Sequence, residues 1–327
     1  MIIFMRGRRF AVCATLALTI GGTGIPAQAE FPERPLRFIV PTAPGGSPDI
    51  VARVLANKLV EQLRQQVIVD VRPGGSGIIG VEIAKAAAPD GYTLLLATFT
   101  TFASLPALKT KLSYDTERDF SALTRAASVA NVVAVHPSLG VNTAAELASL
   151  AKARPGQLNY GSAGNGSPAH IAGEMFDLFA GVKTVHVPYK GAAPALNDLI
   201  SGQLQFIMTS PLVALPHGKS GRIKVIATTG AKRDPLLPEL PPVADAVPGF
   251  EITQWWGVAV PARTPAAVAG KLHAEIVKAL QSPAVQELLA KQGATAHAES
   301  PASFAAFIKA ERGRVARVGR QAGITLD

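Results

Sequence analysis

The stretch Gly46-Ser47-Pro48-Asp49-Ile50-Val51-Ala52 is echoed further along the chain as Gly166-Ser167-Pro168-Ala169-His170-Ile171-Ala172. Each copy follows a strand-like apolar run and a glycine-rich turn, and each opens a segment with helical apolar periodicity. Serine favours the N-cap and proline the first helical position, so each copy predicts a helix start. Such a start behind a glycine-rich loop presents free N–H groups and the positive end of the helix dipole. We therefore expect two lobes whose anion sites face one another across a cleft.

Short apolar runs alternate with helical patterns along most of the chain. The runs at 36–41, 67–71 and 93–97 alternate with helical patterns at 50–63 and 78–88. This order predicts an α/β fold with a parallel sheet and helices on both of its faces. Ligands of such sheets bind at the carboxyl ends of the strands. The candidate binding loops, each after an expected strand, are 41–49, 98–101, 161–167 and 188–193.

A proline-rich, irregular segment at 235–248 indicates a crossing. An apolar run covers 129–135, and a strand is expected to return at 251–260. The returning strand contains Trp255-Trp256, which is typical of packing between lobes, although a place in a cleft wall stays open.

The N-terminal segment is typical of a secretory signal peptide. A positive region that contains Arg6, Arg8 and Arg9 precedes an apolar region at 10–20, and Ala27-Gln28-Ala29 fits a cleavage site. The sequence therefore predicts export to the periplasm, with residues 1–29 removed after Ala29. Cys13 is the only cysteine of the chain and falls in this segment. An exported chain without cysteine has neither disulfides nor a thiolate nucleophile or metal ligand.

Charge and motif patterns exclude several functional classes. The formal net charge is +9, or about +6 without the signal segment, and its scattered basic residues with only 6% aromatics argue against nucleic acid. The six histidines lack metal-ligand spacing, so no metal is expected. The glycine pattern Gly75–Gly80 lacks the acidic residue of a dinucleotide site, so no cofactor is expected. The hydrolase pattern Gly-x-Ser-x-Gly is absent, which leaves His170 as the best candidate base of an enzyme.

Several longer motifs of this chain resemble those of the Bug-type periplasmic solute-binding receptors of tripartite tricarboxylate transporters. The similarity covers essentially the whole exported chain. Its most specific motifs are Phe31-Pro32-Glu33-Arg34-Pro35-Leu36-Arg37, Ala43-Pro44-Gly45-Gly46-Ser47, Asn159-Tyr160-Gly161-Ser162-Ala163-Gly164-Asn165-Gly166-Ser167-Pro168-Ala169-His170 and His186-Val187-Pro188-Tyr189-Lys190-Gly191.

The resemblance implies a type II periplasmic-binding-protein fold, in which two α/β lobes joined by crossing strands close on a ligand. We expect lobe 1 to comprise 30–127 and 252–327, and lobe 2 to comprise 128–251. The implied function is that of a non-enzymatic receptor, monomeric, which captures a small carboxylate and delivers it to the membrane permease subunits. Two alternatives stay open: a receptor that reports to a signalling partner, and an exported α/β hydrolase-type enzyme.

The motifs and the candidate loops together give a set of expected ligand-binding residues. These are Thr42, Ala43, Gly45, Gly46, Ser47, Asp49, Thr98, Ser162, Ala163, Gly164, Ser167, His170, Lys190 and Gly191. Two departures from the family pattern bear on the ligand. Thr42 stands where the family usually has an aromatic residue, and the stretch 202–210 lacks the acidic residues that the family commonly has. Without them, we expect an ammonium-bearing amino acid to be disfavoured.

Overall fold

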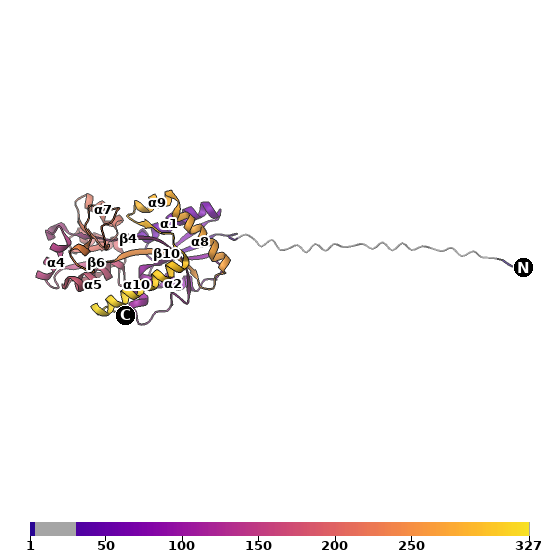
Figure 1. Cartoon of the computed structure of the whole chain (residues 1–327), viewed down its shortest axis with the longest axis horizontal. Coiled ribbons are helices and arrows are strands. Elements are labelled where there is room, and N and C mark those ends of the chain that lie inside the picture. The colour runs from indigo at the N-terminus through magenta and orange to yellow at the C-terminus, as the bar shows by residue number, and fades with distance from the viewer. Residues whose placement is uncertain (4–30, 327) are drawn as a thin grey trace. The chain divides into compact units, whose positions relative to one another are not determined.

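Two β-sheets, each flanked by helices, organise the chain in its computed structural model (Figure 1). The structure describes residues 1–3 and 31–326, so nearly all of the expected signal peptide lies outside the described residues. The compact unit that holds both sheets begins at Pro32. None of the helices described is long and apolar enough to cross a membrane.

The first sheet has six strands in the order β11-β4-β10-β3-β1-β2. Its β1, β2 and β3 run parallel, as the alternation of apolar runs predicts, and β10 is antiparallel to both β3 and β4. The strands are β1 (Leu36–Val40), β2 (Val67–Val71), β3 (Thr93–Thr98), β4 (Phe120–Ala130), β10 (Thr253–Pro261) and β11 (Thr295–Ala296). The α-helices of this part are α1 (Ser47–Leu63), α2 (Ile78–Lys85), α3 (Leu105–Leu108), α8 (Ala266–Gln281), α9 (Pro283–Ala290) and α10 (Pro301–Ala322).

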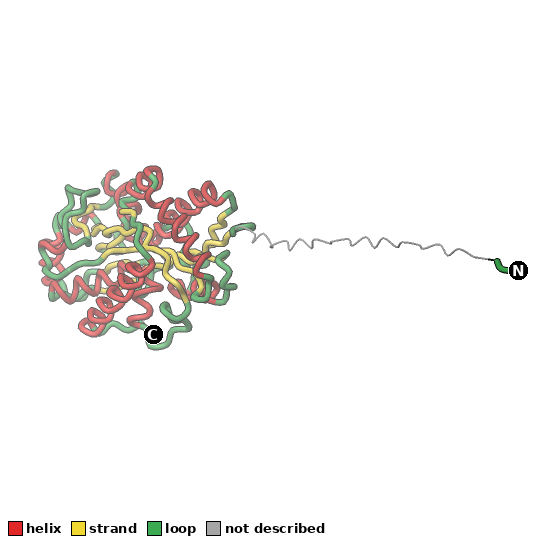
Figure 2. The backbone as a smooth tube through the Cα atoms, turned by 45° about the vertical axis from the view of Figure 1, so that its right-hand side comes forward, coloured by secondary structure: helices red, strands yellow, loops and turns green. Residues whose placement is uncertain are grey.

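The second sheet has five strands in the order β7-β6-β8-β5-β9. In this sheet β6 runs parallel to β7 and β8, and β5 is antiparallel to β8 and β9. The strands are β5 (Val132–Val135), β6 (Asn159–Ser162), β7 (Val185–Pro188), β8 (Phe206–Thr209) and β9 (Lys224–Thr228). The helices are α4 (Ala144–Ala153), α5 (Pro168–Ala180), α6 (Ala192–Ile200) and α7 (Pro211–Lys219). Figure 2 shows the strands in the interior with the helices around them.

Two long paired strands connect the sheets. The chain leaves the first sheet through β4 and returns through β10, and these strands pair with each other from Phe120 to Ala130 (Figure 1). The apolar run 129–135 is therefore two strands rather than one, because Asn131 interrupts it between β4 and β5. The predicted fold of two α/β lobes joined by crossing strands is confirmed.

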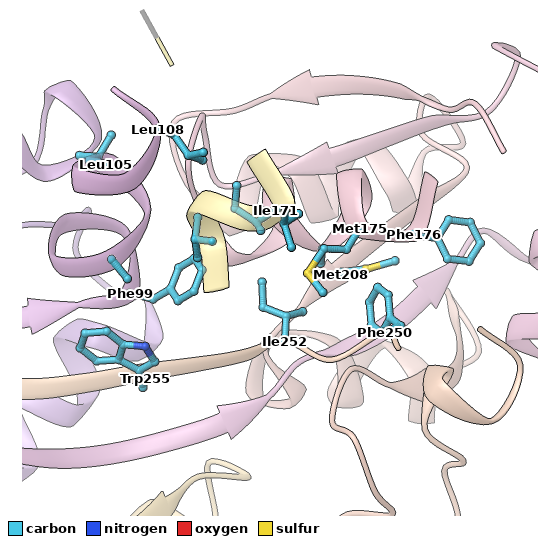
Figure 3. Close-up of a cluster of buried hydrophobic side chains, with 14 of the residues drawn as sticks. Phe99, Leu105, Leu108, Ile171, Met175, Phe176, Met208, Phe250, Ile252 and Trp255 are labelled. Carbon is cyan, nitrogen blue, oxygen red and sulfur yellow. The ribbon is translucent and has the colours of Figure 1, made fainter. Parts of the chain in front are cut away.

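An apolar core extends without interruption from one sheet to the other. In Figure 3, Ile252 lies between Trp255 on one side and Met208 and Phe250 on the other. Trp255 is fully buried and packs edge-on against Phe304, at 5.8 Å between ring centroids. This ring contact joins β10 to α10, both beside the first sheet, and the apolar cluster that contains Trp255 continues to Met208 and Phe250 at the second sheet.

Candidate functional site

A cavity of about 920 Å³ opens at the carboxyl ends of strands from both sheets. The loops after β1, β3, β6, β7 and β8 all contribute to its wall, and β10 adds Gln254 and Trp256. All of the predicted ligand-binding residues except Asp49 and His170 line it. The loops selected by the rule that ligands bind at strand carboxyl ends are thus among those that line this cavity.

The glycine-rich loop before α1 is tied to its helix by Asp49. The backbone N–H of Gly45 donates to Oδ2 of Asp49 at 2.9 Å, and Oδ1 of Asp49 pairs with Nε of Arg53 at 2.9 Å. Gly45 has a φ of +77°, a conformation that L side chains rarely adopt. Both carboxylate oxygens of Asp49 are therefore engaged in holding the loop and the helix together, away from the cavity wall.

The two helix starts predicted from the sequence differ in their caps. Ser167 is the N-cap of α5, as predicted, and its side chain accepts a hydrogen bond from the N–H of His170. At α1 the prediction is wrong, because Gly46 is the N-cap and Ser47 is already in the helix. Ser47 lies on the cavity wall.

Ser162, at the end of β6, is connected to His186 on the neighbouring strand β7. Its Oγ lies 2.6 Å from Nε2 of His186, and the N–H of Gly164 donates to the same Oγ at 3.1 Å. Burial lowers the pKa of His186 to about 4, so its imidazole is neutral near pH 7. The sequence analysis did not select His186, because the pairing of β6 with β7 is what brings it to Ser162.

His170 lies behind this pair and does not reach the cavity. Its ring stacks on that of His186 at 4.1 Å between centroids, and its Nδ1 accepts a hydrogen bond from the N–H of Gly166 at 3.1 Å. Burial, with a smaller contribution from His186, lowers the pKa of His170 to about 3. His170 is therefore a neutral, buried support for the loop before α5.

Four helix N-termini meet at the cavity. The N-cap residues Gly46 of α1, Ser167 of α5, Gly191 of α6 and Ser210 of α7 all line its wall. Among the described lining residues, Lys190 alone carries a charge. Helix dipoles and one lysine, with no carboxylate on the wall, make a site whose electrostatics favour an anion.

Several lining residues were not anticipated from the sequence. The glycine pattern at 75–80 contributes Gly75, Ser76 and Gly77 to the wall, although the sequence does not support a nucleotide site there. Asn131, Ser210 and Gln254 also line the cavity, and so does Trp256, for which the sequence left a place in a cleft wall open. A usable signal existed only for Ser210, because Ser210-Pro211 repeats the Ser-Pro helix start after an apolar run. No group of three or more potential metal ligands occurs in the part of the chain that the structure describes.

Comparison with known proteins agrees with this architecture. The chain is similar to the protein BugT of Bordetella pertussis, with 33% identity over 98% of this chain and 100% of the relative. It is similar to the structure of R. palustris Rpa4515 with adipate, with a TM-score of 0.86 and 34% identity over 90% of this chain and 99% of that one. A second similar structure, MatC (Rpa3494) from Rhodopseudomonas palustris with bound malate, has a TM-score of 0.82 and 28% identity, and the match covers 88% of this chain and 99% of that one.

The family model described as the tripartite tricarboxylate transporter family receptor matches residues 51–324. This range includes most of α1 and both sheets apart from β1, and it covers the loops of the second lobe that line the cavity. The chain belongs to the receptor family of the tripartite tricarboxylate transporters.

Proposed function

We propose that this protein captures a small carboxylate in the cavity between its lobes and delivers it to the permease subunits of a tripartite tricarboxylate transporter. The observation that carries the proposal is the convergence of four helix N-caps and Lys190 on a wall without carboxylates. Adipate and malate in the two similar structures support this ligand class. Such a receptor acts in the periplasm, in line with the secretory signal read from the sequence.

The ligand's carboxylate is proposed to lie between the loops before α1 and α5. The backbone N–H groups of these loops would donate to the carboxylate, as amides at helix N-termini do with anions. The lining residues that we assign to binding are Thr42, Ala43, Gly45, Gly46, Ser47, Thr98, Ser162, Ala163, Gly164, Ser167, Lys190 and Gly191. Asp49 and His170 are assigned to support of these loops.

The role of Ser162 depends on which nitrogen of His186 carries the proton. If Nε2 of His186 is bare, the hydroxyl of Ser162 donates to it and offers the ligand only an acceptor. If Nε2 carries the proton, it donates to Oγ of Ser162, whose own hydrogen can then turn from the carbonyl of Gly164, 3.2 Å away, to a carboxylate oxygen. We propose that the bound ligand selects this second tautomer.

The two lobes are proposed to meet at residues 127/128 and 251/252, within or beside the crossing strands β4 and β10. Only these two passages of the chain connect the sheets, so a small change of backbone angle there would rotate one lobe against the other. Ligand contacts made only in the closed form would shift the population towards closure. Closure of this kind needs no second subunit, so we propose a monomer.

A thermal-shift screen of residues 30–327 against mono-, di- and tricarboxylates, amino acids and aromatic acids tests the proposed function. Stabilisation by a ligand grows as RT ln(1 + [L]/Kd), or about 2.7 kcal/mol at a hundredfold excess over Kd. We expect a selective shift for carboxylates, with the ligand recovered unchanged. Refolding the protein from denaturant releases any ligand retained from expression. If the refolded protein still shows no thermal shift with any carboxylate, the proposal is refuted.

The 2.6 Å contact of Ser162 with His186 is the one observation that favours an enzyme, since a serine beside a histidine is the pattern of an activated nucleophile. The pKa of His186, lowered to about 4, makes it a weak base, and its described contacts are Ser162 and the rings of Tyr160 and His170. A carboxylate that would orient the imidazole is not among them. Hydrolysis of p-nitrophenyl esters that disappears in Ser162→Ala would revive this alternative.

A further inference from the structure

Asn131 and Ser210 lie side by side on the cavity wall. Val132 pairs with Thr209 in the antiparallel ladder of β5 and β8, so the next position along places Asn131 opposite Ser210. Both residues line the cavity, and both are almost fully buried, with exposed fractions of 2% and 5%.

Each of these side chains has a polar atom without a partner among the described residues. Neither Oδ1 of Asn131 nor Oγ of Ser210 makes a hydrogen bond. A buried polar atom left without a hydrogen bond destabilises the folded chain, because it has lost its bonds to water. Two such atoms at adjacent positions on a ligand cavity therefore indicate a position where a bound group completes the hydrogen bonding.

The side chain of Ser210 is unusual when it is compared with other helix starts in the same chain. Four helices have a serine N-cap followed by proline. In three of them the serine side chain accepts a hydrogen bond from the N–H three residues on, at Ser167, Ser282 and Ser300. Ser210 has the same extended backbone, with φ −58° and ψ 140°, yet its hydroxyl does not cap α7. The hydroxyl of Ser210 therefore lacks the backbone N–H partner that the other three serines have, and it lies on the cavity wall.

The sheet order fixes how far this pair lies from the proposed carboxylate site. Asn131 precedes β5, and Ser162 ends β6, with β8 between them. Ser210 follows β8, which pairs directly with β6, so one inter-strand spacing of about 5 Å separates Ser210 from the strand of Ser162, and two spacings, about 10 Å, separate Asn131 from it. Lys190 follows β7, one strand further away, so the pair has no cation beside it on this sheet edge.

We propose that Asn131 and Ser210 form a subsite for a neutral hydroxyl group at the end of the ligand remote from its carboxylate. The inference rests on the proposed function and specifies the ligand class of the same cavity. A hydroxyl donates its hydrogen to Oδ1 of Asn131 and accepts one from Oγ of Ser210, which satisfies both atoms as they stand. The N-terminus of α7 lies beside a second carboxylate at this position, but such a group has no hydrogen for Oδ1 of Asn131, and its charge would be buried without a cation. The ligand is then a hydroxycarboxylic acid rather than a dicarboxylate.

Calorimetry with matched ligand pairs tests the subsite on residues 30–327. The pairs are 6-hydroxyhexanoate with adipate and 4-hydroxybenzoate with terephthalate, and hexanoate and benzoate serve as references without a terminal polar group. In at least one pair we expect the hydroxy acid to bind about tenfold more tightly than the dicarboxylate. Ser210→Ala and Asn131→Ala should each remove this preference by weakening the hydroxy acid alone, because one hydrogen bond is lost.

Two control variants separate this inference from the proposed function. Ser282→Ala removes the same kind of N-cap serine at α9, outside the cavity lining, and should leave all affinities unchanged. Ser162→Ala should weaken both members of each pair equally. If the dicarboxylate bound as tightly as its hydroxy acid in both pairs, or if hexanoate and 6-hydroxyhexanoate lost equal affinity in Ser210→Ala, the subsite would be overturned but the receptor function would stand. Absence of binding by every carboxylate would overturn both.

Discussion

Oγ of Ser162 and Nε2 of His186 lie 2.6 Å apart on adjacent parallel strands, with Ser162 on the cavity wall. The pair connects the surface that meets a ligand to a buried stack of aromatic rings. Tyr160 continues this stack at 5.0 Å between its ring centroid and that of His186, and its hydroxyl donates to Glu174 at 2.8 Å. We expect the orientation of the Ser162 hydroxyl to depend on His186, which lies outside the cavity lining, as well as on Gly164.

His186→Phe tests this dependence. Phenylalanine retains a ring for the stack with Tyr160 but removes the nitrogen that bonds Ser162, so the hydroxyl loses its orientation. We expect carboxylate affinity to fall about tenfold, the worth of one hydrogen bond to a charged group at the lower end of its range. Titration calorimetry measures the loss, and His136→Phe, which alters a histidine outside the cavity, is the control. If His186→Phe bound carboxylates as tightly as the unaltered chain, the contact of Ser162 with His186 would have no role in binding.

The stacked histidines make stability depend on pH in a defined direction. Burial holds the pKa of His186 at about 4 and that of His170 at about 3, below the value near 6.5 of an unfolded histidine. The unfolded chain therefore binds more protons than the native one as the pH falls below 6.5, and the free energy of unfolding falls with it, down to about pH 4 through His186 and about pH 3 through His170. Below about pH 3 both states are protonated and this contribution stops changing.

Urea unfolding at pH 7.5 and pH 5 measures this dependence. In His170→Asn the amide oxygen can still accept from the N–H of Gly166, but the titrating ring is absent. The loss of stability between the two pH values should be smaller in this variant than in the unaltered chain. An equal loss in both proteins would show that His170 titrates normally in the native state.

The sequence predicts those parts of this site that depend on residues close together in the chain. The starts of α1 and α5 follow from serine, proline and glycine within a few residues of each other, and their loops do line the cavity. Asn131 and Trp256 are different, because their place on the wall follows from the order of strands in two sheets. No local pattern around Asn131 carries that order, because the residue lies within the apolar run 129–135. His170 is the opposite case, because the local pattern suggests a contact that the structure does not show. Its position at a helix start suggests a ligand contact, but its ring accepts a hydrogen bond from the N–H of Gly166 and lies outside the cavity lining.

Lys190→Met tests the contribution of the single charge on the described cavity wall. The residue is exposed, so we expect a modest loss of carboxylate affinity, about twofold to fivefold at low salt. Most of this difference should vanish at 1 M salt, where the Debye length is about 3 Å. Calorimetric titrations at both salt concentrations give the comparison. Lys183→Met, an exposed lysine outside the cavity lining, should change neither affinity, and a loss for Lys190→Met that persists at high salt would contradict the electrostatic role.

Two glycines within helices should respond to substitution by alanine with opposite changes in the free energy of unfolding. Gly173 in α5 packs against Tyr160, and a Cβ there would come within 2.2 Å of two ring carbons. Gly270 in α8 has open space around the same position. Alanine is preferred over glycine in a helix interior by about 1 kcal/mol, so Gly270→Ala should stabilise the protein by about this amount. Gly173→Ala gains the same propensity but displaces a buried ring, at a cost of about 1–3 kcal/mol.

Denaturant titration of both variants measures the free energies of unfolding, and carboxylate affinity provides a second readout. Tyr160 stacks on His186, so displacement of its ring in Gly173→Ala should also disturb Ser162 and weaken binding several-fold. Gly270→Ala should bind as the unaltered chain does. If Gly173→Ala were destabilised yet bound ligand normally, the ring stack would serve the fold alone, and the orientation of Ser162 would have to come from His186 and Gly164 without help from Tyr160.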